Sequence, residues 1–142
     1  MFPHLSLLSL TVLGTTQGKL YGFGSNYYGQ LAGKTAIGDF TFKPSPIVAP
    51  AIDGRKFVDV QAGGDNTIAQ TLNGTEQVMW LFGSNRYGQL GVQENAGEWD
   101  FNPDPRSLTT CELMDPEFCD QYTVLSSSVG SDFAIIQTAA KV

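Results

Sequence analysis

The sequence predicts an all-β fold in which small sheets repeat around an axis, as in a β-propeller. Stretches of about four to six residues rich in β-branched and aromatic side chains recur along the chain. Turns containing glycine separate these stretches about every ten residues. No segment shows a sustained helical period with caps, so we expect few helices. Radial repetition is one way in which such short strands avoid exposed sheet edges.

The expected strands and turns alternate in a regular order. Strands are expected at Phe57–Val60, Thr67–Leu72, Val78–Phe82 and Phe133–Thr138. Asn73-Gly74 joins the second and third of these as a hairpin turn, because both residues tolerate a positive φ. Gln17-Gly18 fills the same slot between two earlier strands. The turns therefore predict antiparallel sheets.

An internal repeat explains this regularity. Phe23–Leu31 returns as Phe82–Leu90, with eight of nine positions identical at an offset of 59 in the numbering. The same offset carries the two prolines of Pro44–Pro46 onto those of Pro103–Pro105. Repeats of this length are typical of propellers and related arrays.

A second block repeats at a different spacing. The block Val58–Thr71 reappears at an offset of 67, most clearly over Val129–Thr138. Eight extra residues are therefore expected between Pro105 and Leu125. A fainter third copy, Thr11–Thr15, comes earlier in the chain. The chain thus holds about two repeats and part of another.

The repeated residues resemble a known family. Gly-Ser-Asn-x-Tyr-Gly-Gln-Leu, then Pro-x-x-Val, Val-x-Val-x-Ala-Gly-Gly and x-Thr-x-Ala are similar to the regulator of chromosome condensation repeat. The resemblance covers about residues 6–142 and is most specific over residues 19–91. It implies that each repeat contributes one four-stranded blade, partly by exchanging strands with its neighbour, in rings of seven blades.

The resemblance implies about two four-stranded antiparallel blades with an inserted acidic loop. Residues 1–18 are then a remnant of a preceding repeat, 19–74 are repeat one, and 75–142 are repeat two with an insertion at about 92–124. The implied repeat scaffold is Gly24, Asn26, Tyr28, Gly29, Gln30, Leu31, Gly63, Gly83, Asn85, Tyr87, Gly88, Gln89, Leu90 and Gly130.

The chain departs from the family pattern at several positions. Phe23 and Phe82 stand where the family often has Trp, and Asn66 and Phe133 stand where it commonly has His. Ala32 occupies a usual glycine position. Glycines of the scaffold are better preserved than polar residues, so the resemblance predicts the fold more firmly than the function.

Acidic residues are concentrated in one segment. Residues 94–120 carry eight acidic side chains against Arg106 alone, whereas the whole chain has a net charge of −6. An acidic chain argues against nucleic acid as a partner. We expect the acidic loop to bind a protein partner with a basic surface. The candidate contact residues are Glu94, Glu98, Trp99, Asp100, Asp104, Glu112, Asp115, Glu117 and Asp120.

Both cysteines, Cys111 and Cys119, lie in this segment. They form a disulfide if the chain enters an oxidising compartment, and are otherwise two free thiols in a surface loop. Without an adjacent His they make a poor zinc site. Asp100–Asp104 has the spacing that opens a calcium loop, but Pro105 stands in place of the turn glycine. We therefore expect a solvated acidic loop and no metal ion.

The sequence offers no catalytic constellation. His4 is the only histidine, which excludes most acid–base and nucleophilic triads within the chain. Gly22–Tyr27 resembles the start of a dinucleotide fingerprint, yet its last glycine is missing and no helix is expected to follow. No apolar run approaches the roughly 20 residues that span a bilayer. We expect no enzyme activity, no cofactor and no membrane span.

The sequence predicts a non-catalytic repeat module for protein–protein interaction. We expect a fragment of a longer repeat protein, because two repeats cannot close a ring. Other propeller repeats, in cis or by self-association, would cover its exposed sheet edges. The resemblance implies an alternative, part of a guanine-nucleotide exchange factor for a small GTPase, which is the activity of the family's founding member.

Residues 1–18 have two interpretations. Leu5–Gly14 resembles the core of a signal peptide, but Met1–His4 lacks a positive charge. Residues 11–18 match Thr67–Gly74 in register, which favours a strand of a preceding repeat and predicts a cytoplasmic or nuclear protein. A signal peptide would instead predict a secreted, propeller-like binding protein.

Overall fold

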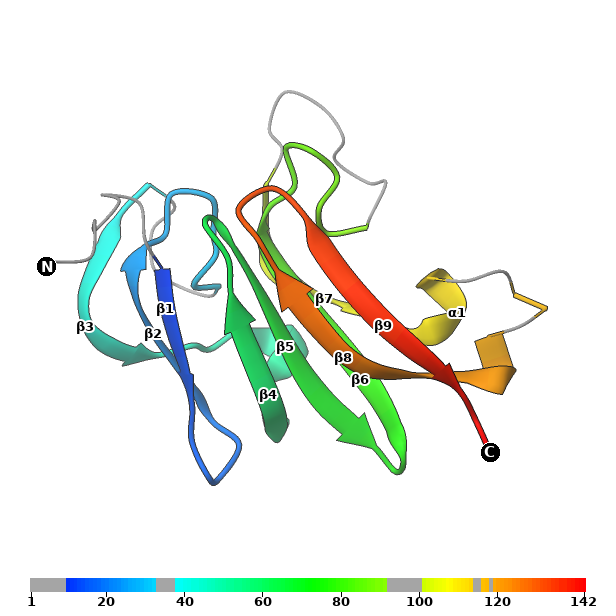
Figure 1. The fold of residues 1–142 in the computed structure, drawn as a ribbon. Helices are drawn as coiled ribbons and strands as arrows, with labels where there is room; N and C mark the ends of the chain where they lie inside the picture. Colours follow the sequence, from blue (N-terminus) through cyan, green and yellow to red (C-terminus); the bar gives the residue numbers. More distant parts are fainter. Residues whose placement is uncertain (1–9, 33–37, 92–100, 114–115, 118) are drawn as a thin grey trace, which may run out of the picture.

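The computed structural model describes residues 10–32, 38–91, 101–113, 116–117 and 119–142 (Figure 1). Strands make up most of the described secondary structure. In chain order the elements are β1 (Leu10–Gly14), β2 (Leu20–Ser25), β3 (Phe40–Pro46), η1 (Pro50–Ile52), β4 (Phe57–Ala62), β5 (Asn66–Asn73), β6 (Glu76–Ser84), β7 (Phe101–Leu108), α1 (Thr110–Leu113), η2 (Cys119–Gln121), β8 (Tyr122–Val129) and β9 (Ala134–Ala140).

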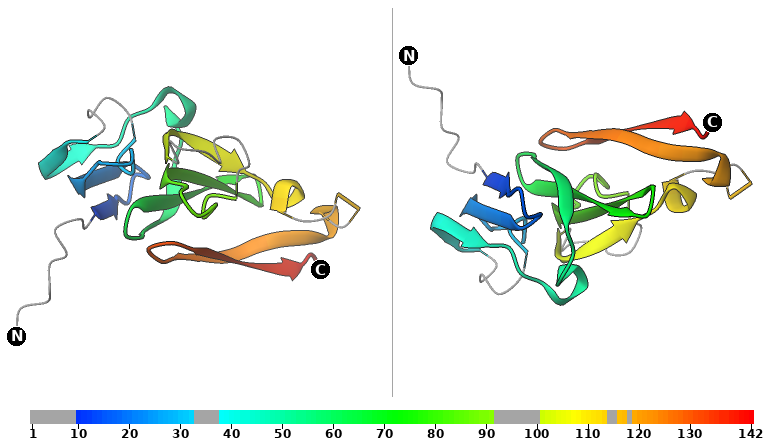
Figure 2. Two further views of the ribbon diagram at one scale, coloured as in Figure 1. Left: turned by 90° about the horizontal axis from the view of Figure 1, so that it is seen from above. Right: turned by 90° about the horizontal axis from the view of Figure 1, so that it is seen from below.

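Three antiparallel sheets stand side by side (Figure 1, Figure 2). Their strand orders are β1-β2-β3, β4-β5-β6-β7 and β8-β9. The prediction of an all-β, partial propeller is confirmed. Within the described residues, however, one sheet has four strands and its neighbours have three and two. The reason is that β4 and β5 come from the first predicted repeat and β6 and β7 from the second.

The helical content is low, as the sequence predicts. In the described part of the chain, no helix is long and apolar enough to cross a membrane.

The hairpin β8–β9 repeats the hairpin β4–β5. Phe57 pairs with Thr71, and Val124 pairs with Thr138, so both partners move by the same offset of 67. The register of each hairpin also shifts directly after the pair named here, between Phe57 and Asp59 in one and between Val124 and Ser126 in the other. Residues separated by the sequence offset of 67 therefore occupy equivalent positions in the two hairpins, and each residue of β5 that pairs with β4 has a counterpart in β9.

The outer strands follow a different spacing from the predicted one. Gly24 pairs with Thr41, and its repeat counterpart Gly83 pairs with Asn102. The glycines are separated by the expected offset of 59, but their partners are separated by 61. The match of Pro44–Pro46 to Pro103–Pro105 is therefore wrong by two positions. Two of the eight extra residues therefore precede β7 instead of following Pro105.

Part of the predicted acidic loop is a strand. Residues 101–108 form β7, which pairs with β6 at the outer edge of the four-stranded sheet. Prolines fit at such an edge because one side of the strand makes no ladder hydrogen bonds. The non-strand part of the described insertion is residues 109–113, 116–117 and 119–121, which we call the insertion segment.

Hydrophobic packing covers both faces of the four-stranded sheet. At the first junction, between the β1–β3 and β4–β7 sheets, Trp80 and Phe82 of β6 share a core with Leu20 of β2. At the second junction, between the β4–β7 and β8–β9 sheets, Met79 of β6 shares a core with Val124 of β8. Alternate residues of a strand point to opposite faces, so β6 contributes to both cores.

Gly83 and Gly74 provide a matched test of this packing. Both have a positive φ, of 111° and 64°. A Cβ on Gly83 would clash with the carbonyl oxygen of Asp65 and lie 2.8 Å from the Cα of Asn66, whereas a Cβ on Gly74 would meet nothing within 4 Å. We expect Gly83→Ala to lower the free energy of unfolding by about 3 kcal/mol or more, and Gly74→Ala by about 1 kcal/mol. Urea denaturation measures both; equal losses would contradict this packing.

Candidate functional site

The two copies of the repeated motif form nearly identical buried loops. The Oδ1 atom of Asn26 accepts a hydrogen bond from the backbone N–H of Leu31 at 2.8 Å, and Asn85 accepts one from Leu90 at 3.0 Å. The Oε1 atom of Gln30 accepts a hydrogen bond from the backbone N–H of Tyr28 at 2.8 Å. Each side chain replaces a backbone partner that a tight loop cannot supply, which explains why polar residues are buried here.

The remaining scaffold residues lie in the same loops and in the inner hairpins. Gln89 repeats the bond of Gln30 by accepting from the backbone N–H of Tyr87 at 2.9 Å. Tyr87 itself is 67% exposed. The N–H of Gly63 donates to the carbonyl of Asn66, and the N–H of Gly130 to that of Phe133, both at 2.8 Å. Leu31 and Leu90 are buried, and Gly24, Gly29, Gly83 and Gly88 have a positive φ.

The first loop is also bonded to the next sheet. Thr67 donates from Oγ1 to the carbonyl of Gln30 at 2.7 Å, and Gln30 donates from Nε2 to Asp65 at 3.3 Å. At the second junction the counterpart of Thr67 is Ala134, which has no hydroxyl. Gln89 donates instead to Ser84 of its own sheet at 3.3 Å. The two copies therefore differ in how they contact the following sheet.

Charged residues act on the carboxyl group of Asp65, which lies in the turn between β4 and β5. The pKa of Asp65 is raised because the carboxyl group is partly buried and because the carboxylate of Asp132 repels its negative charge; the guanidinium of Arg86 acts in the opposite direction. These three residues are not among the contact residues predicted from the sequence. The offset of the second repeated block, which carries Asp65 onto Asp132, was the signal that could have found the pair.

A pocket of about 410 Å³ opens beside the first junction. Its lining combines apolar residues such as Ile47 and Ile52 with Lys19, Arg55 and Lys56. The guanidinium of Arg55 lies 4.2 Å from the ring centre of Trp80, a cation–π contact that engages the arginine in packing. The described lining residues include no His, Cys, Ser or Thr.

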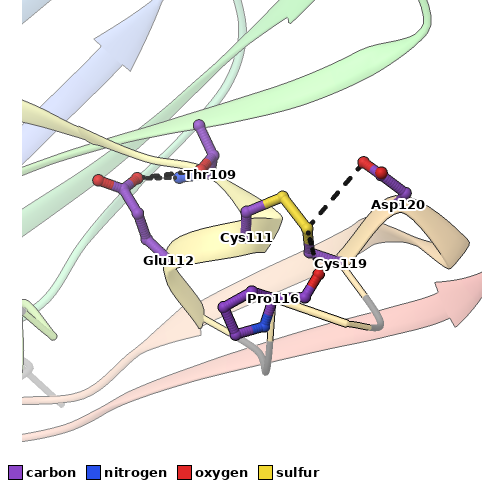
Figure 3. Close-up of a disulfide and its surroundings, with 6 residues drawn as sticks. All are labelled: Thr109, Cys111, Glu112, Pro116, Cys119 and Asp120. Carbon is purple, nitrogen blue, oxygen red and sulfur yellow. Dashed lines mark hydrogen bonds between the residues drawn. A yellow bond between two sulfur atoms is a disulfide. The ribbon is translucent and has the colours of Figure 1, made fainter.

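The insertion segment begins with a capped helix. The Oε2 atom of Glu112 accepts hydrogen bonds from the backbone N–H of Thr109 at 2.7 Å and from its hydroxyl at 3.0 Å (Figure 3). A Thr followed three residues later by Glu is the capping-box pattern, in which the Glu satisfies a donor before the first turn. Glu112 thus has a local structural role in addition to its charge.

A disulfide closes the insertion segment. Cys111 and Cys119 are bonded to each other, with Cα atoms 4.5 Å apart, and the disulfide ties α1 to η2 (Figure 3). Cys119 is buried, and its Sγ lies 3.4 Å from the carbonyl oxygen of Pro116 and 4.0 Å from a carboxylate oxygen of Asp120. The two cysteines and Asp120 lie close enough together to form a cluster of possible metal ligands. A metal ion binds cysteine as a thiolate, however, and the two sulfurs of a disulfide are not thiolates.

The structure describes only some of the predicted contact residues. Asp104 is exposed on β7, and Glu112, Glu117 and Asp120 are exposed on the insertion segment. The other five predicted contact residues lie outside the described residues: Glu94, Glu98, Trp99, Asp100 and Asp115. Asp100 is also the first residue of the segment with calcium-loop spacing, so the start of that segment is not described either. The described residues therefore bring three of the predicted acids onto one short, disulfide-closed segment.

Comparison with known proteins identifies the repeat. The family model for the regulator of chromosome condensation (RCC1) repeat matches residues 17–70. The chain belongs to the RCC1 repeat family. It is 33% identical over 98 residues to Protein RCC2 homolog of Xenopus laevis and 35% identical over 95 residues to the secretion-regulating guanine nucleotide exchange factor of Bos taurus. These alignments cover 69% and 66% of this chain but 17% and 19% of the relatives.

Two solved structures share the fold. The structure of human WBSCR16 matches with a TM-score of 0.66 at 20% identity over 89% of this chain and 28% of that one. Prp20p from Saccharomyces cerevisiae matches with a TM-score of 0.64 at 18% identity over the same shares. The chain thus spans less than a third of each of these proteins, and its likeness to the two solved structures shows the fold.

The charges around Asp65 give a pH-dependent prediction. A carboxyl with a raised folded-state pKa destabilises the fold as pH rises from the ordinary value of 3.8 through the folded-state pKa. Asp65→Asn, which keeps an oxygen for Gln30, should therefore increase stability at pH 7 and have no effect well below pH 3.8. In an NMR titration, Asp132→Asn should lower the pKa of Asp65 and Arg86→Gln should raise it. An unchanged pKa in both variants would refute this environment.

The disulfide gives a redox-dependent prediction. Closing a loop of this size stabilises a protein by about 2 to 3 kcal/mol in the chain-entropy model. The pair Cys111→Ser and Cys119→Ser should lower the urea midpoint, and dithiothreitol should lower that of the parent chain but not that of the variant. Labelling of two thiols by iodoacetamide in the unreduced, folded chain would show that the disulfide is not formed in solution.

Proposed function

We propose that this chain is a non-catalytic propeller module for protein–protein interaction, and that the insertion segment contacts the partner. The observation that carries the proposal is the position of the extra residues. The strands keep the register of the repeat, whereas the insertion segment, which contains α1 and η2, projects from the sheets (Figure 2). Its Glu117 and Asp120 are exposed to solvent. A loop held by a rigid scaffold is a common location for binding residues.

The charge of the insertion segment indicates the kind of partner. Residues 109–121 contain Glu112, Asp115, Glu117 and Asp120 and no Lys or Arg. Opposite charge on a partner accelerates encounter and fixes orientation. We infer a partner with a basic surface. Prp20p, whose fold this chain shares, has binding properties toward Gsp1p and histones, and histones are basic proteins, so they are a suitable probe.

The disulfide strengthens this proposal. It joins α1 to η2 and so limits the conformations of Glu112, Glu117 and Asp120. A segment that is already ordered loses less conformational entropy on binding. The disulfide also supports the secreted alternative for localisation, because such bonds persist in oxidising compartments. Thiol labelling of the natural protein in its own compartment distinguishes the two localisations.

Part of a guanine-nucleotide exchange factor is the second candidate function. The name of the Bos taurus relative, 35% identical over 95 residues, favours it. The chain covers 19% of that relative, so the exchange activity of the larger protein does not transfer to these residues by similarity. If this chain alone stimulated GDP release from a small GTPase, the second candidate would replace the first.

A neutralised insertion segment tests the first candidate. Glu117→Gln with Asp120→Asn should weaken binding to core histones about fivefold, since exposed charge pairs contribute about 0.5 kcal/mol each. Asp53→Asn with Asp59→Asn removes the same charge from exposed positions elsewhere and should leave affinity unchanged. Fluorescence anisotropy at two salt concentrations measures both. Equal weakening by the two pairs, or binding that salt does not affect, would contradict the proposal.

A further inference from the structure

The triplet Asn73-Gly74-Thr75 is the only Asn-x-Ser/Thr sequence in the chain. Asn-x-Ser/Thr, with any residue except Pro in the middle, is the acceptor sequence for N-linked glycosylation. The triplet lies where β5 turns into β6, and this hairpin turns at the lower edge of the molecule as drawn in Figure 1. A hairpin turn has residue preferences of its own, so the requirements of the turn must be separated from those of an acceptor site.

The turn itself requires only Gly74. Asn73 pairs with Glu76 across the hairpin, so Gly74 and Thr75 are the two residues of the loop. Gly74 has a φ of 64°, whereas Asn73 and Thr75 are not among the described residues with a positive φ. A two-residue loop with glycine first is typical of a type II′ turn, which needs neither an Asn before the glycine nor a Thr after it. Asn is also disfavoured in strands, yet Asn73 is the last residue of β5.

The side chains of Asn73 and Thr75 have no structural partner. Both residues are exposed, and in the described part of the chain neither side chain makes a hydrogen bond. A Cβ added at Gly74, which lies between them, would meet nothing within 4 Å. The space around the turn is therefore open to a bulky group on Asn73.

The hairpin β1–β2 turns without such a triplet. Gly18 in its turn also has a positive φ, of 77°, but Gln17 and Lys19 stand on either side of it. Both hairpins thus use a glycine for the change of direction. The scaffold therefore accounts for Gly74 and leaves Asn73 and Thr75 without a role in the fold.

The disulfide is a second observation that points to glycosylation. Cys111 and Cys119 are bonded to each other, in a part of the chain far in sequence from the triplet. Disulfides form and persist in the lumen of the endoplasmic reticulum and outside the cell, and are rare in the cytosol and nucleus. N-glycans are attached to chains that enter the same secretory route. Neither feature depends on the interpretation of residues 1–18.

We propose that Asn73 carries an N-linked glycan, attached in the compartment in which Cys111 and Cys119 are oxidised. The side-chain nitrogen Nδ2 of Asn73 forms a bond to the anomeric carbon of an oligosaccharide carried on a lipid diphosphate. The bond from that carbon to the phosphate oxygen breaks, the lipid diphosphate leaves, and Nδ2 loses one proton. Thr75 completes the sequence that the transferase recognises. Asn73 lies outside the insertion segment, so this site goes beyond the proposed function and does not rest on it.

Digestion of the natural protein with peptide N-glycosidase tests the site. The chain should move in one step to a lower apparent mass on a denaturing gel, and mass spectrometry of the tryptic peptide Phe57–Arg86 should find Asn73 converted to Asp. A sample kept without the glycosidase is the control, because an Asn followed by Gly also deamidates on its own. In the same preparation, both cysteines should resist thiol labelling until they are reduced.

Variants of the full chain, expressed in eukaryotic cells behind a secretory leader, assign the modified residue. Asn73→Gln and Thr75→Val should each lose the mass step completely, whereas Thr75→Ser should keep it, since Ser also completes the acceptor sequence. Exposed side chains without hydrogen bonds are replaced, so the variants should fold. Gln17→Asn combined with Lys19→Thr puts the same triplet into the β1–β2 turn and should add a second step.

Each of three results would overturn the proposal. One is a natural protein whose cysteines resist labelling but whose mass the glycosidase does not change. Another is a natural protein with two free thiols and no glycan. The third is a mass step that persists in Asn73→Gln, or one that only the added triplet in the β1–β2 turn produces. The histone experiment compares charges of the insertion segment in chains without glycan, so a failure here leaves it unaffected.

Discussion

The structure depends on covering both faces of one sheet. In the β4–β7 sheet, Trp80 and Phe82 point to one face and Met79 to the other, so each face carries hydrophobic side chains that must be buried. An isolated blade of this kind would expose a hydrophobic core on each face. The neighbouring sheets therefore belong to the same folding unit. Hydrophobic packing supplies the main attraction between the sheets, and hydrogen bonds from the first motif loop to Thr67 and Asp65 add to it.

Much of this arrangement can be predicted from the sequence. The offset of 67 reproduces the pairing of β4 with β5 in β8 and β9, including the irregularity after Phe57 and after Val124. The proline match fails because two prolines separated by one residue occur at more than one alignment. Only backbone pairing distinguishes an offset of 59 from one of 61. Residues 101–108 are likewise predicted to belong to the inserted loop, and only their backbone pairing with β6 shows that they form an edge strand.

The candidate sites are less predictable. Spacing alone permits both a disulfide and two free thiols at Cys111 and Cys119, since the choice depends on the geometry of the intervening chain and on the compartment. The charge of Glu112 is evident in the sequence, but its hydrogen bonds to Thr109 appear only in the structure.

Strand β6 belongs to two cores at once, and this has a consequence for unfolding. Separating the sheets at the first junction removes the packing around Trp80, and any resulting shift of β6 also moves Met79 at the second. Nearest-neighbour coupling of this kind makes a repeat array melt as one cooperative unit over short lengths. The two junctions should therefore unfold together, because both cores contain side chains of the same strand.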